Sequence, residues 1–326
     1  GAAGEDLWVL ASFAGGGGGA NYSNSGSISS GNPATGAGNS LSDIANSSGG
    51  TGDMQTVVNT FNTYSAAQLK SEVPKLAPVT NNALTSASLA TVNAGLGTIS
   101  ARLANLRGEQ LALAGQSGLS AGDSERNRSV WLKGFGSWGQ QDAKDFYTGY
   151  KTHSAGLSLG ADTLIGTSEL RLGAAFSYAG TSVDQQDARA GDSANVKSYQ
   201  GTVYAMKEFG AAYLDGLLAY ARHDYKSHRA TALSRTASGD WNGTQLSARL
   251  DTGYRIQLGA GTVIPLASLE WSQLKQYAYT ETGADSLNLN VDAARTTRLR
   301  SGFGARLQTD TFVGGMAAKP EVRVVW

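Results

Sequence analysis

From residue 129 onward, apolar residues alternate with polar or very small ones along the chain. Leu157 and Leu159, for example, alternate with Ser158 and Gly160. A period of two places the two sets of side chains on opposite faces of a β-strand, so each strand separates an apolar environment from a polar one. We predict about nine strands, at 129–141, 152–165, 168–183, 198–209, 212–228, 240–258, 261–281, 295–312 and 316–326.

The length and the ends of these strands favour a membrane barrel over a soluble sandwich. Strands of roughly 10 to 15 residues exceed the usual 5 or 6 of soluble sheets, whereas tilted membrane strands need about 9 to 11. Aromatic residues stand near strand ends, as in the interfacial girdles of outer-membrane barrels. They are Trp131, Trp138, Tyr178, Tyr213, Tyr225, Trp241, Tyr254, Trp271, Tyr277 and Tyr279. The sequence therefore predicts an all-β fold, an antiparallel transmembrane β-barrel.

The connections between the predicted strands alternate in length. The tight, glycine-bearing links are 166–167, 210–211, 259–260 and 313–315. The long, polar links are 142–151, 184–197, 229–239 and 282–294. Short turns on one side and long loops on the other are typical of an outer-membrane barrel, with the turns in the periplasm. By this parity the first strand begins on the periplasmic side, and the segment before it ends there.

The segment at 61–128 has a different pattern. Its apolar residues repeat at steps of three and four, which predicts a helix. The repeating positions include Leu89, Val92, Leu96, Ile99 and Leu103. No charged residue stands between Lys75 and Arg102, although the outer face of a surface helix normally carries charge. We therefore predict a pore helix at 81–107, roughly 40 Å long, inside the barrel lumen. A packing helix of a small N-terminal domain is the alternative.

Composition separates the N-terminal segment from the rest. Residues 1–60 are rich in Gly, Ser and Asn, with consecutive glycines at 15–19. Such a segment buries too little apolar surface to offset the entropy of folding, so we predict that it is largely disordered. The predicted domains are this segment at 1–60, a linker at 61–128 and an incomplete barrel at 129–326.

Charge and composition exclude several classes of function. The 26 basic and 26 acidic side chains cancel, which argues against a nucleic-acid partner. The absence of cysteine excludes disulfides and thiolate catalysis. His153, His223 and His228 are too scattered to form a metal site. Gly122-Asp123-Ser124 resembles a lipase nucleophile motif only superficially, because no oxyanion loop or Asp-His pair follows it. We predict no metal and no cofactor.

Several motifs follow one another in a definite order between about residues 60 and 326. They include Ala67-Gln68-Leu69-Lys70-Ser71-Glu72-Val73, Arg102-Leu103-Ala104-Asn105-Leu106-Arg107, Ser129-Val130-Trp131-Leu132-Lys133-Gly134-Phe135-Gly136-Ser137, Tyr213-Leu214-Asp215-Gly216, Tyr279-Thr280-Glu281-Thr282-Gly283 and Pro320-Glu321-Val322-Arg323. Together these motifs resemble the translocator β-domain of autotransporters (type V secretion). The order of many motifs makes this resemblance more specific than any one of them.

The resemblance implies a barrel of about 12 strands in the bacterial outer membrane, with an α-helical linker in its lumen. It implies that the barrel exports its own N-terminal passenger to the cell surface, with residues 1–60 as the remnant of that passenger. The implied partners are outer-membrane lipid, the passenger and the β-barrel assembly machinery. Because only about nine strands are counted here, we expect the chain to be truncated at Trp326.

The candidate functional residues lie on the polar strand faces and on the helix. The charges expected to face the lumen and contact the linker are Lys133, Arg171, Asp215, Arg249, Asp251, Arg255, Arg300, Arg306, Glu321 and Arg323. Some autotransporters cut their linker by cyclisation of an Asn side chain. The resemblance makes Asn93 and Asn81 the candidates for such single-turnover self-cleavage, and no other catalytic residue is expected.

Three functions agree with this sequence. The first is an outer-membrane translocator that exports its own passenger. The second is an outer-membrane adhesin or pore-type barrel plugged by a helix. The third is a soluble β-rich binding domain with a disordered N-terminus.

Overall fold

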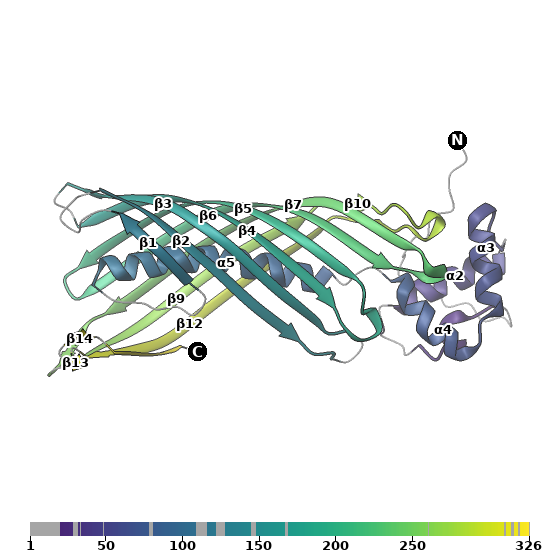
Figure 1. The fold of residues 1–326 in the computed structure, drawn as a ribbon, viewed down its shortest axis with the longest axis horizontal. Helices are drawn as coiled ribbons and strands as arrows, with labels where there is room; N and C mark the ends of the chain where they lie inside the picture. Colours follow the sequence, from purple (N-terminus) through teal and green to yellow (C-terminus); the bar gives the residue numbers. More distant parts are fainter. Residues whose placement is uncertain are drawn as a thin grey trace.

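The computed structural model describes residues 20–28, 32, 34–47, 49–77, 81–108, 116–121, 128–144, 148–166, 169–259, 261–309, 311–313, 316–318 and 320–325. One antiparallel sheet curls around a long helix, and a cluster of short helices lies at one end of the curled sheet (Figure 1). The predicted fold class is confirmed.

The strands of the sheet follow one another in chain order. Its long strands are β2 (Arg128–Gln141), β3 (Tyr150–Ile165), β4 (Leu170–Gln185), β5 (Ser193–Phe209), β6 (Ala212–Ala230), β7 (Thr236–Tyr254), β9 (Gly261–Gln276) and β12 (Ala294–Thr309). Shorter strands of the same sheet are β1 (Gln116–Ala121), β8 (Ile256–Leu258) and β15 (Glu321–Val325), with β8 paired to β9. Within the described residues, β1 pairs only with β2, and β15 pairs only with β12, so the half-barrel is open between these two strands.

The two faces of the sheet have opposite character. Large apolar side chains such as Leu157, Phe176 and Leu299 are exposed on the convex face. Small polar side chains such as Ser158 and Ser177 are buried on the concave face. A soluble sheet buries its apolar face, so this arrangement fits an apolar solvent outside and an aqueous or polar interior.

The two ends of the half-barrel differ as the link lengths predicted. At one end the strands join through tight turns, where Gly210 and Gly259 have φ of +64° and +61°, a conformation that glycine adopts without strain. A further hairpin, β13 (Thr311–Val313) with β14 (Met316–Ala318), lies at the same end (Figure 1). We call this the turn end. At the other end, the loop end, the longer connections carry η2 (Asp187–Arg189), η3 (Ala232–Ser234), β10 (Tyr279–Thr280), η4 (Asp285–Leu287) and β11 (Asn290–Val291).

The long helix is α5 (Asn81–Leu106), close to the bounds predicted for the pore helix. It runs along the concave face from the loop end to the turn end (Figure 1) and contacts β2 to β6 and β9. Among the described helices, none combines the length and the apolar content that a bilayer-spanning helix requires.

Four short helices precede α5: α1 (Tyr22–Ser25), α2 (Ala34–Ser47), α3 (Gly52–Thr63) and α4 (Ala66–Glu72), with the 3-10 turn η1 (Val73–Leu76) after them. The prediction that residues 1–60 are largely disordered is therefore wrong for the described part from residue 20, and residues 1–19 lie outside the described residues. These helices share their core with Leu287 and Leu289 of the barrel loops. The composition of residues 1–60 could not reveal these partners, because Leu287 and Leu289 lie more than 200 residues later in the chain.

Two further expectations need correction. Strand β1 was not predicted, because its residues Gln116–Ala121 carry only Leu119 as a large apolar side chain. Of the aromatic residues assigned to interfacial girdles, four are instead buried on the concave side: Trp131, Tyr213, Tyr225 and Trp241. Helix α5 carries mainly small side chains, so space remains between the helix and the wall, and the large aromatic rings of the wall fill it.

Candidate functional site

The candidate site is the interface between α5 and the concave wall. The helix residues Val92, Leu96, Ile99 and Leu103 are buried there, in one cluster with wall residues that include Leu217. Leu89 is buried as well. Burying one such side chain contributes about 1.5–3 kcal/mol, so this apolar seam is the main source of helix attachment.

A glycine lets the helix approach the wall closely. A Cβ atom added to Gly95 would lie 2.6 Å from Oε1 of Gln200 on β5. That separation is too short for any larger side chain without a shift of Gln200. Wall glycines play a similar part, since the rings of Trp131 and Tyr204 lie over Gly160 and Gly173 of neighbouring strands.

In the half of α5 near the loop end, neutral hydroxyl groups join the helix to the wall. Ser88 Oγ is 2.9 Å from the Tyr225 hydroxyl, and Thr91 Oγ1 is 2.9 Å from Thr181 Oγ1. Further along, Thr98 donates to Ser158 Oγ at 3.2 Å. These contacts satisfy buried polar atoms without any charge.

Near the turn end, the contacts become ionic. The Arg102 guanidinium lies 3.4 Å from Asp162 Oδ2, and its other branch donates to Ser129 Oγ at 2.6 Å. Asp162 also accepts from Arg171 at 2.7 Å and from the Tyr204 hydroxyl at 3.2 Å. The buried Asp162 carboxylate is thus bound by two arginines, one from the helix and one from the wall.

A second ion pair lies one turn further along the helix. Arg107 donates from Nη1 to both oxygens of Asp215 on β6, each at 2.8 Å, and both side chains are almost fully buried. The same guanidinium lies 3.8 Å from the centre of the Tyr213 ring. A paired and stacked arginine of this kind holds the end of the helix in one position.

Asn93 lies near the middle of α5, beside a cluster of charges around Glu270. In the orientation that gives both amide atoms a partner, Nδ2 donates to Glu270 Oε2 at 2.5 Å and Oδ1 accepts from Arg300 at 2.7 Å. Glu270 also lies 2.9 Å from Arg298 and 3.7 Å from Arg249. The buried carboxylate of Glu270 therefore forms ion pairs with several arginines next to the Asn93 amide.

A cavity of about 200 Å³ lies between this side of the helix and the wall. Its lining includes Asn93, Ser100, Arg107, Asp251 and Arg306. Ser100 donates to Asp251 Oδ2 at 3.0 Å across it. The cavity is polar and charged, as expected for part of a lumen.

The structure places the predicted lumen charges at different distances from the helix. Asp215, Asp251 and Arg300 contact helix residues or Asn93 directly, and Arg249 pairs with Asp251 and lies beside Glu270. Arg171 pairs with Asp162, which in turn binds Arg102 of the helix. Arg306 pairs with Glu321 at 3.2 Å and Arg255 with Glu208 at 2.9 Å, all within the wall. Lys133 is half-buried on β2, and Arg323 is exposed on β15. Asn81 is the first residue of α5, and its side chain lies outside the described residues.

Sequence reasoning missed the residues at the centres of these clusters. Asp162 and Glu270 were not among the candidates, nor were Arg102 and Arg107 of the helix. The alternation in β3 could have indicated Asp162, because this residue follows Ser158 and Gly160 at every second position and therefore faces the lumen. An isolated acid in such a series has to meet a cation in the lumen.

The histidines have structural positions. His223 is buried, with Nδ1 2.8 Å from Ser198 Oγ and Nε2 3.3 Å from Gln245 Oε1. In the described part of the chain, no group of three or more His, Asp or Glu side chains is placed to hold a metal ion.

Comparisons with known proteins agree on one kind of molecule. A family model described as the autotransporter β-domain matches residues 130–326. Outer membrane protein A of Rickettsia conorii is 25% identical over 223 residues, which are 64% of this chain and 11% of that protein. Outer membrane protein B of Rickettsia japonica is 26% identical over 218 residues, which are 63% of this chain and 13% of that protein. The chain thus spans about a tenth of the length of these curated relatives.

The fold also matches a solved structure. The translocator domain of autotransporter NalP from Neisseria meningitidis aligns with a TM-score of 0.50 and 18% identity, over 68% of this chain and 71% of that chain. At this identity the likeness concerns the fold alone.

Proposed function

Because this chain belongs to the autotransporter β-domain family, we propose that it exports the segment N-terminal to α5 through its own lumen to the cell surface. The chain is a translocator domain of the bacterial outer membrane. Its membership of that family and its exposed apolar face leave no support for a soluble binding domain.

The observation that carries the export proposal is the course of α5. The helix begins at the loop end, where the N-terminal helices lie, and ends at the turn end, where β2 begins. A chain that inserts its barrel from the periplasm and has its N-terminal helices outside must have passed through the lumen. Helix α5 occupies that path.

The partners of the chain follow from its surfaces. The exposed apolar side chains of the convex face form a surface suited to lipid tails. We further propose that the β-barrel assembly machinery of the cell inserts the barrel, and that the exported passenger is the chain's own N-terminal segment. The Gly- and Ser-rich composition of residues 1–60 suits passage as an unfolded segment.

Surface display tests the proposal. A small epitope placed ahead of residue 20 in the full-length protein should be detected by antibody on intact cells. A cysteine probe adds a positional check, because the chain has no cysteine of its own. Ala67→Cys, exposed on α4, should react with a membrane-impermeant maleimide on intact cells, whereas Gln257→Cys near a tight turn should react only after lysis.

An epitope that is detected only in lysed cells would overturn the export proposal. It would favour the alternative function, an outer-membrane adhesin or pore-type barrel plugged by a helix. The labelling of Gln257→Cys shows in the same experiment whether the outer membrane was intact.

A specific observation favours a second activity, single-turnover self-cleavage after Asn93. The Asn93 amide nitrogen donates to the Glu270 carboxylate, which is placed to accept a proton from it. In this proposal Nδ2 attacks the backbone carbonyl carbon of Asn93 and closes a succinimide, while the peptide bond to Ala94 breaks. One Nδ2 proton passes to Glu270, and the leaving Ala94 nitrogen gains a proton, so protons balance.

Mass spectrometry of the exported protein tests this activity. Cleavage gives a barrel fragment that begins at Ala94, and Asn93→Ala and Glu270→Gln should each abolish it. Asn81 stays the alternative position, for which the fragment would begin at Asn82. A protein that stays full-length in outer membranes, with a band identical to that of Asn93→Ala, contradicts self-cleavage but leaves export untouched.

A further inference from the structure

The short N-terminal helices and the loop end share one hydrophobic core. On the helix side it contains Leu41, Met54, Val57, Phe61 and Leu76, all buried. On the barrel side it contains Ala232, Ala237, Ala284, Leu287 and Leu289, which are at most 1% exposed. The barrel loops therefore supply part of the core on which helices α1 to α4 pack.

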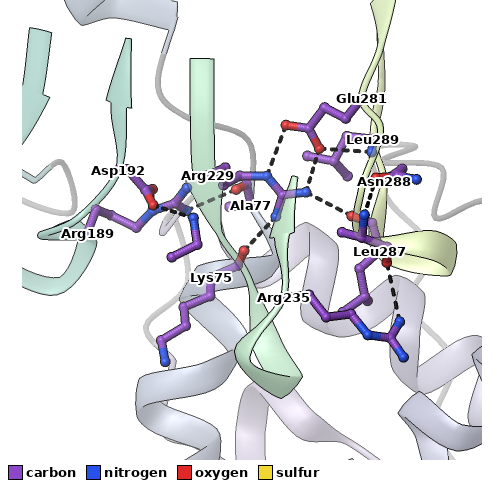
Figure 2. Close-up of polar contacts among 12 residues, drawn as sticks. Lys75, Ala77, Arg189, Asp192, Arg229, Arg235, Glu281, Leu287, Asn288 and Leu289 are labelled. Atoms are coloured by element: carbon purple, nitrogen blue, oxygen red, sulfur yellow. Dashed lines mark hydrogen bonds and ion pairs between the residues drawn. The ribbon is translucent and has the colours of Figure 1, made fainter. Parts of the chain in front are cut away.

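Two arginines of the barrel bind the end of this helical segment (Figure 2). Arg229, at the end of β6, is fully buried and donates from Nη1 to the backbone carbonyl of Lys75 at 2.7 Å. Its Nε and Nη2 pair with Glu281 at 3.0 and 2.5 Å, and Nη2 also donates to the Leu287 carbonyl. The guanidinium thus bridges the loop at 277–293 and the turn η1.

Arg189 of η2 makes a parallel contact from the other side. Its Nη1 donates to the carbonyls of Pro74 and Ala77 at 2.7 and 2.9 Å, and its Nε donates to Asp192 at 2.6 Å. Asp192 in turn accepts from the backbone N–H of Ala230 at 2.7 Å. Burial lowers the pKa of Arg189, and the neighbouring Asp192 opposes this effect.

The chemistry of these contacts suits a docking site for a helix end. The last carbonyls of a helical turn carry partial negative charge, so cations bind them well, and the Pro74 carbonyl also accepts from the Ala77 N–H within η1. Asp192 and Glu281 hold the two guanidinium groups in place from the barrel side, so that donors are oriented toward η1. A third contact lies further out, where Arg235 donates to both oxygens of Asp53 at 2.7 Å.

We propose that helices α1 to α4 and the turn η1 form a cap that closes the external mouth of the barrel, and that Arg189 and Arg229 are the latch that holds it. The latch binds the chain immediately before α5, so it also fixes the outer end of the plug helix. The cap forms its full core only against the loops, and therefore only after this segment has reached the cell surface. The assignment of the loop end to the outside rests on the proposed function.

Cysteine labelling in the full-length protein tests the latch. Ala77→Cys places a small thiol beneath the latch, where the native side chain is 5% exposed. On intact cells it should react slowly with an impermeant maleimide. Two latch variants are then combined with it: Arg189→Met with Asp192→Asn, and Arg229→Met with Glu281→Met. Each should raise the labelling rate of Ala77→Cys by about tenfold or more, because several charge-assisted hydrogen bonds are lost. The paired substitutions avoid leaving a buried unpaired carboxylate.

Matched variants separate the possible failures. Arg222→Met removes an exposed arginine of the same strand, which pairs only with Asp224 at 3.1 Å among the described contacts, and should leave the labelling rate unchanged. Arg189→Lys keeps the charge but has one nitrogen in place of the two that bind Asp192 and the η1 carbonyls, and should give an intermediate rate. The barrel is checked in every variant by its heat-dependent gel mobility.

The two proposals fail in different ways. If Ala67→Cys does not react on intact cells in the parent protein, export is wrong and with it the external position of the cap. If Ala67→Cys reacts but Ala77→Cys stays equally protected in both latch variants, export stands and the latch is wrong. The latch is also wrong if Arg222→Met exposes Ala77→Cys as much as the latch variants do.

Discussion

The two halves of α5 are joined to the barrel by different chemistry. In the half near the loop end, hydroxyl groups such as Ser88 and Thr91 meet Tyr225 and Thr181 without charge. In the half near the turn end, Arg102 and Arg107 form buried ion pairs with wall carboxylates. Breaking a buried ion pair leaves an unpaired charge and costs about 3–5 kcal/mol, whereas a neutral hydrogen bond contributes about 1 kcal/mol.

This difference suggests separate roles along one helix. Neutral hydroxyl contacts are readily exchanged between one Ser- or Thr-rich segment and the next, so they suit a wall along which a polar chain passes. The ion pairs depend on two particular arginines, which lie at the turn end of the helix. They suit the arrest of the chain in one position.

The largest effect is expected from the apolar seam that both halves share. Leu96→Asp places a charge in the cluster around Ile99 and should destabilise helix attachment by about 5 kcal/mol. Ile99→Asp should act alike. The melting temperature in detergent should fall. In a form of the protein in which additional strands close the barrel, conductance in planar bilayers should rise as the helix leaves the lumen. Deletion of residues 81–105 should give the same open conductance.

Ser86→Asp is the control, because this side chain of α5 is exposed. It should change neither quantity. A Leu96→Asp protein that melts and conducts like Ser86→Asp would show that α5 is not held by its apolar residues.

Breaking the ionic half should have the next largest effect. Asp215→Asn removes the carboxylate charge of an almost fully buried ion pair with Arg107, and should lower the free energy of unfolding by about 3 kcal/mol. The measurement is a denaturant titration in detergent, followed by protease accessibility at Arg102. A double variant, Arg107→Met with Asp215→Leu, should recover most of the loss. Equal losses in the single and double variants would mean that charge pairing is not the cause.

A matched change in the neutral half should be milder. Thr91→Val keeps the shape of the side chain and removes its hydroxyl, while Thr181 retains a hydrogen bond with Ser154 at 2.8 Å. The expected loss is about 1 kcal/mol in the same titration. If this loss equals that of Asp215→Asn, the two halves do not differ as described.

The smallest effect concerns an ion pair that is partly exposed. A hydrogen bond from Arg235 lowers the pKa of Asp53 from 3.8 to about 2, against a smaller opposing effect of burial. A carboxyl whose folded pKa is depressed stabilises the folded state above its unfolded pKa and loses that contribution as pH falls through the folded value. Solvent screening reduces the expected contribution to about 1 kcal/mol.

Asp53→Asn should therefore weaken cap docking at pH 7, and its effect should fade between about pH 4 and pH 2, the range set by the two pKa values. The melting temperatures of the variant and its parent in detergent, each measured at every pH, report the docking. A difference between the variant and its parent that persists unchanged at pH 2 would contradict the assigned pKa.

Local periodicity was enough to predict the architecture. The period of two in segments such as 152–165 reveals two faces, and the structure exposes Leu157 while it buries Ser158, as predicted. The steps of three and four around Leu96 predicted a helix whose observed bounds differ by a single residue from the prediction. Both signals are carried by neighbouring residues, so they can be read without knowledge of the fold.

What the sequence could not provide were partners that are distant in the chain. Asp162 meets Arg102 only because the helix lies against β3, and no local pattern announces that contact. Trp131 has an aromatic position near a strand end, yet it faces the slim helix and not the membrane interface. The core of the cap depends in the same way on Leu287, more than 200 residues after Phe61.

The close fit of Gly95 against Gln200 has a consequence for the position of α5 along the lumen. One helical turn, about 5.4 Å, separates Gly95 from Thr91 on one side and from Ile99 on the other. A helix displaced by one turn in either direction would drive one of these side chains into Gln200. The Gln200 side chain therefore disfavours both one-turn shifts and acts as an index mark for the position of α5 along the lumen.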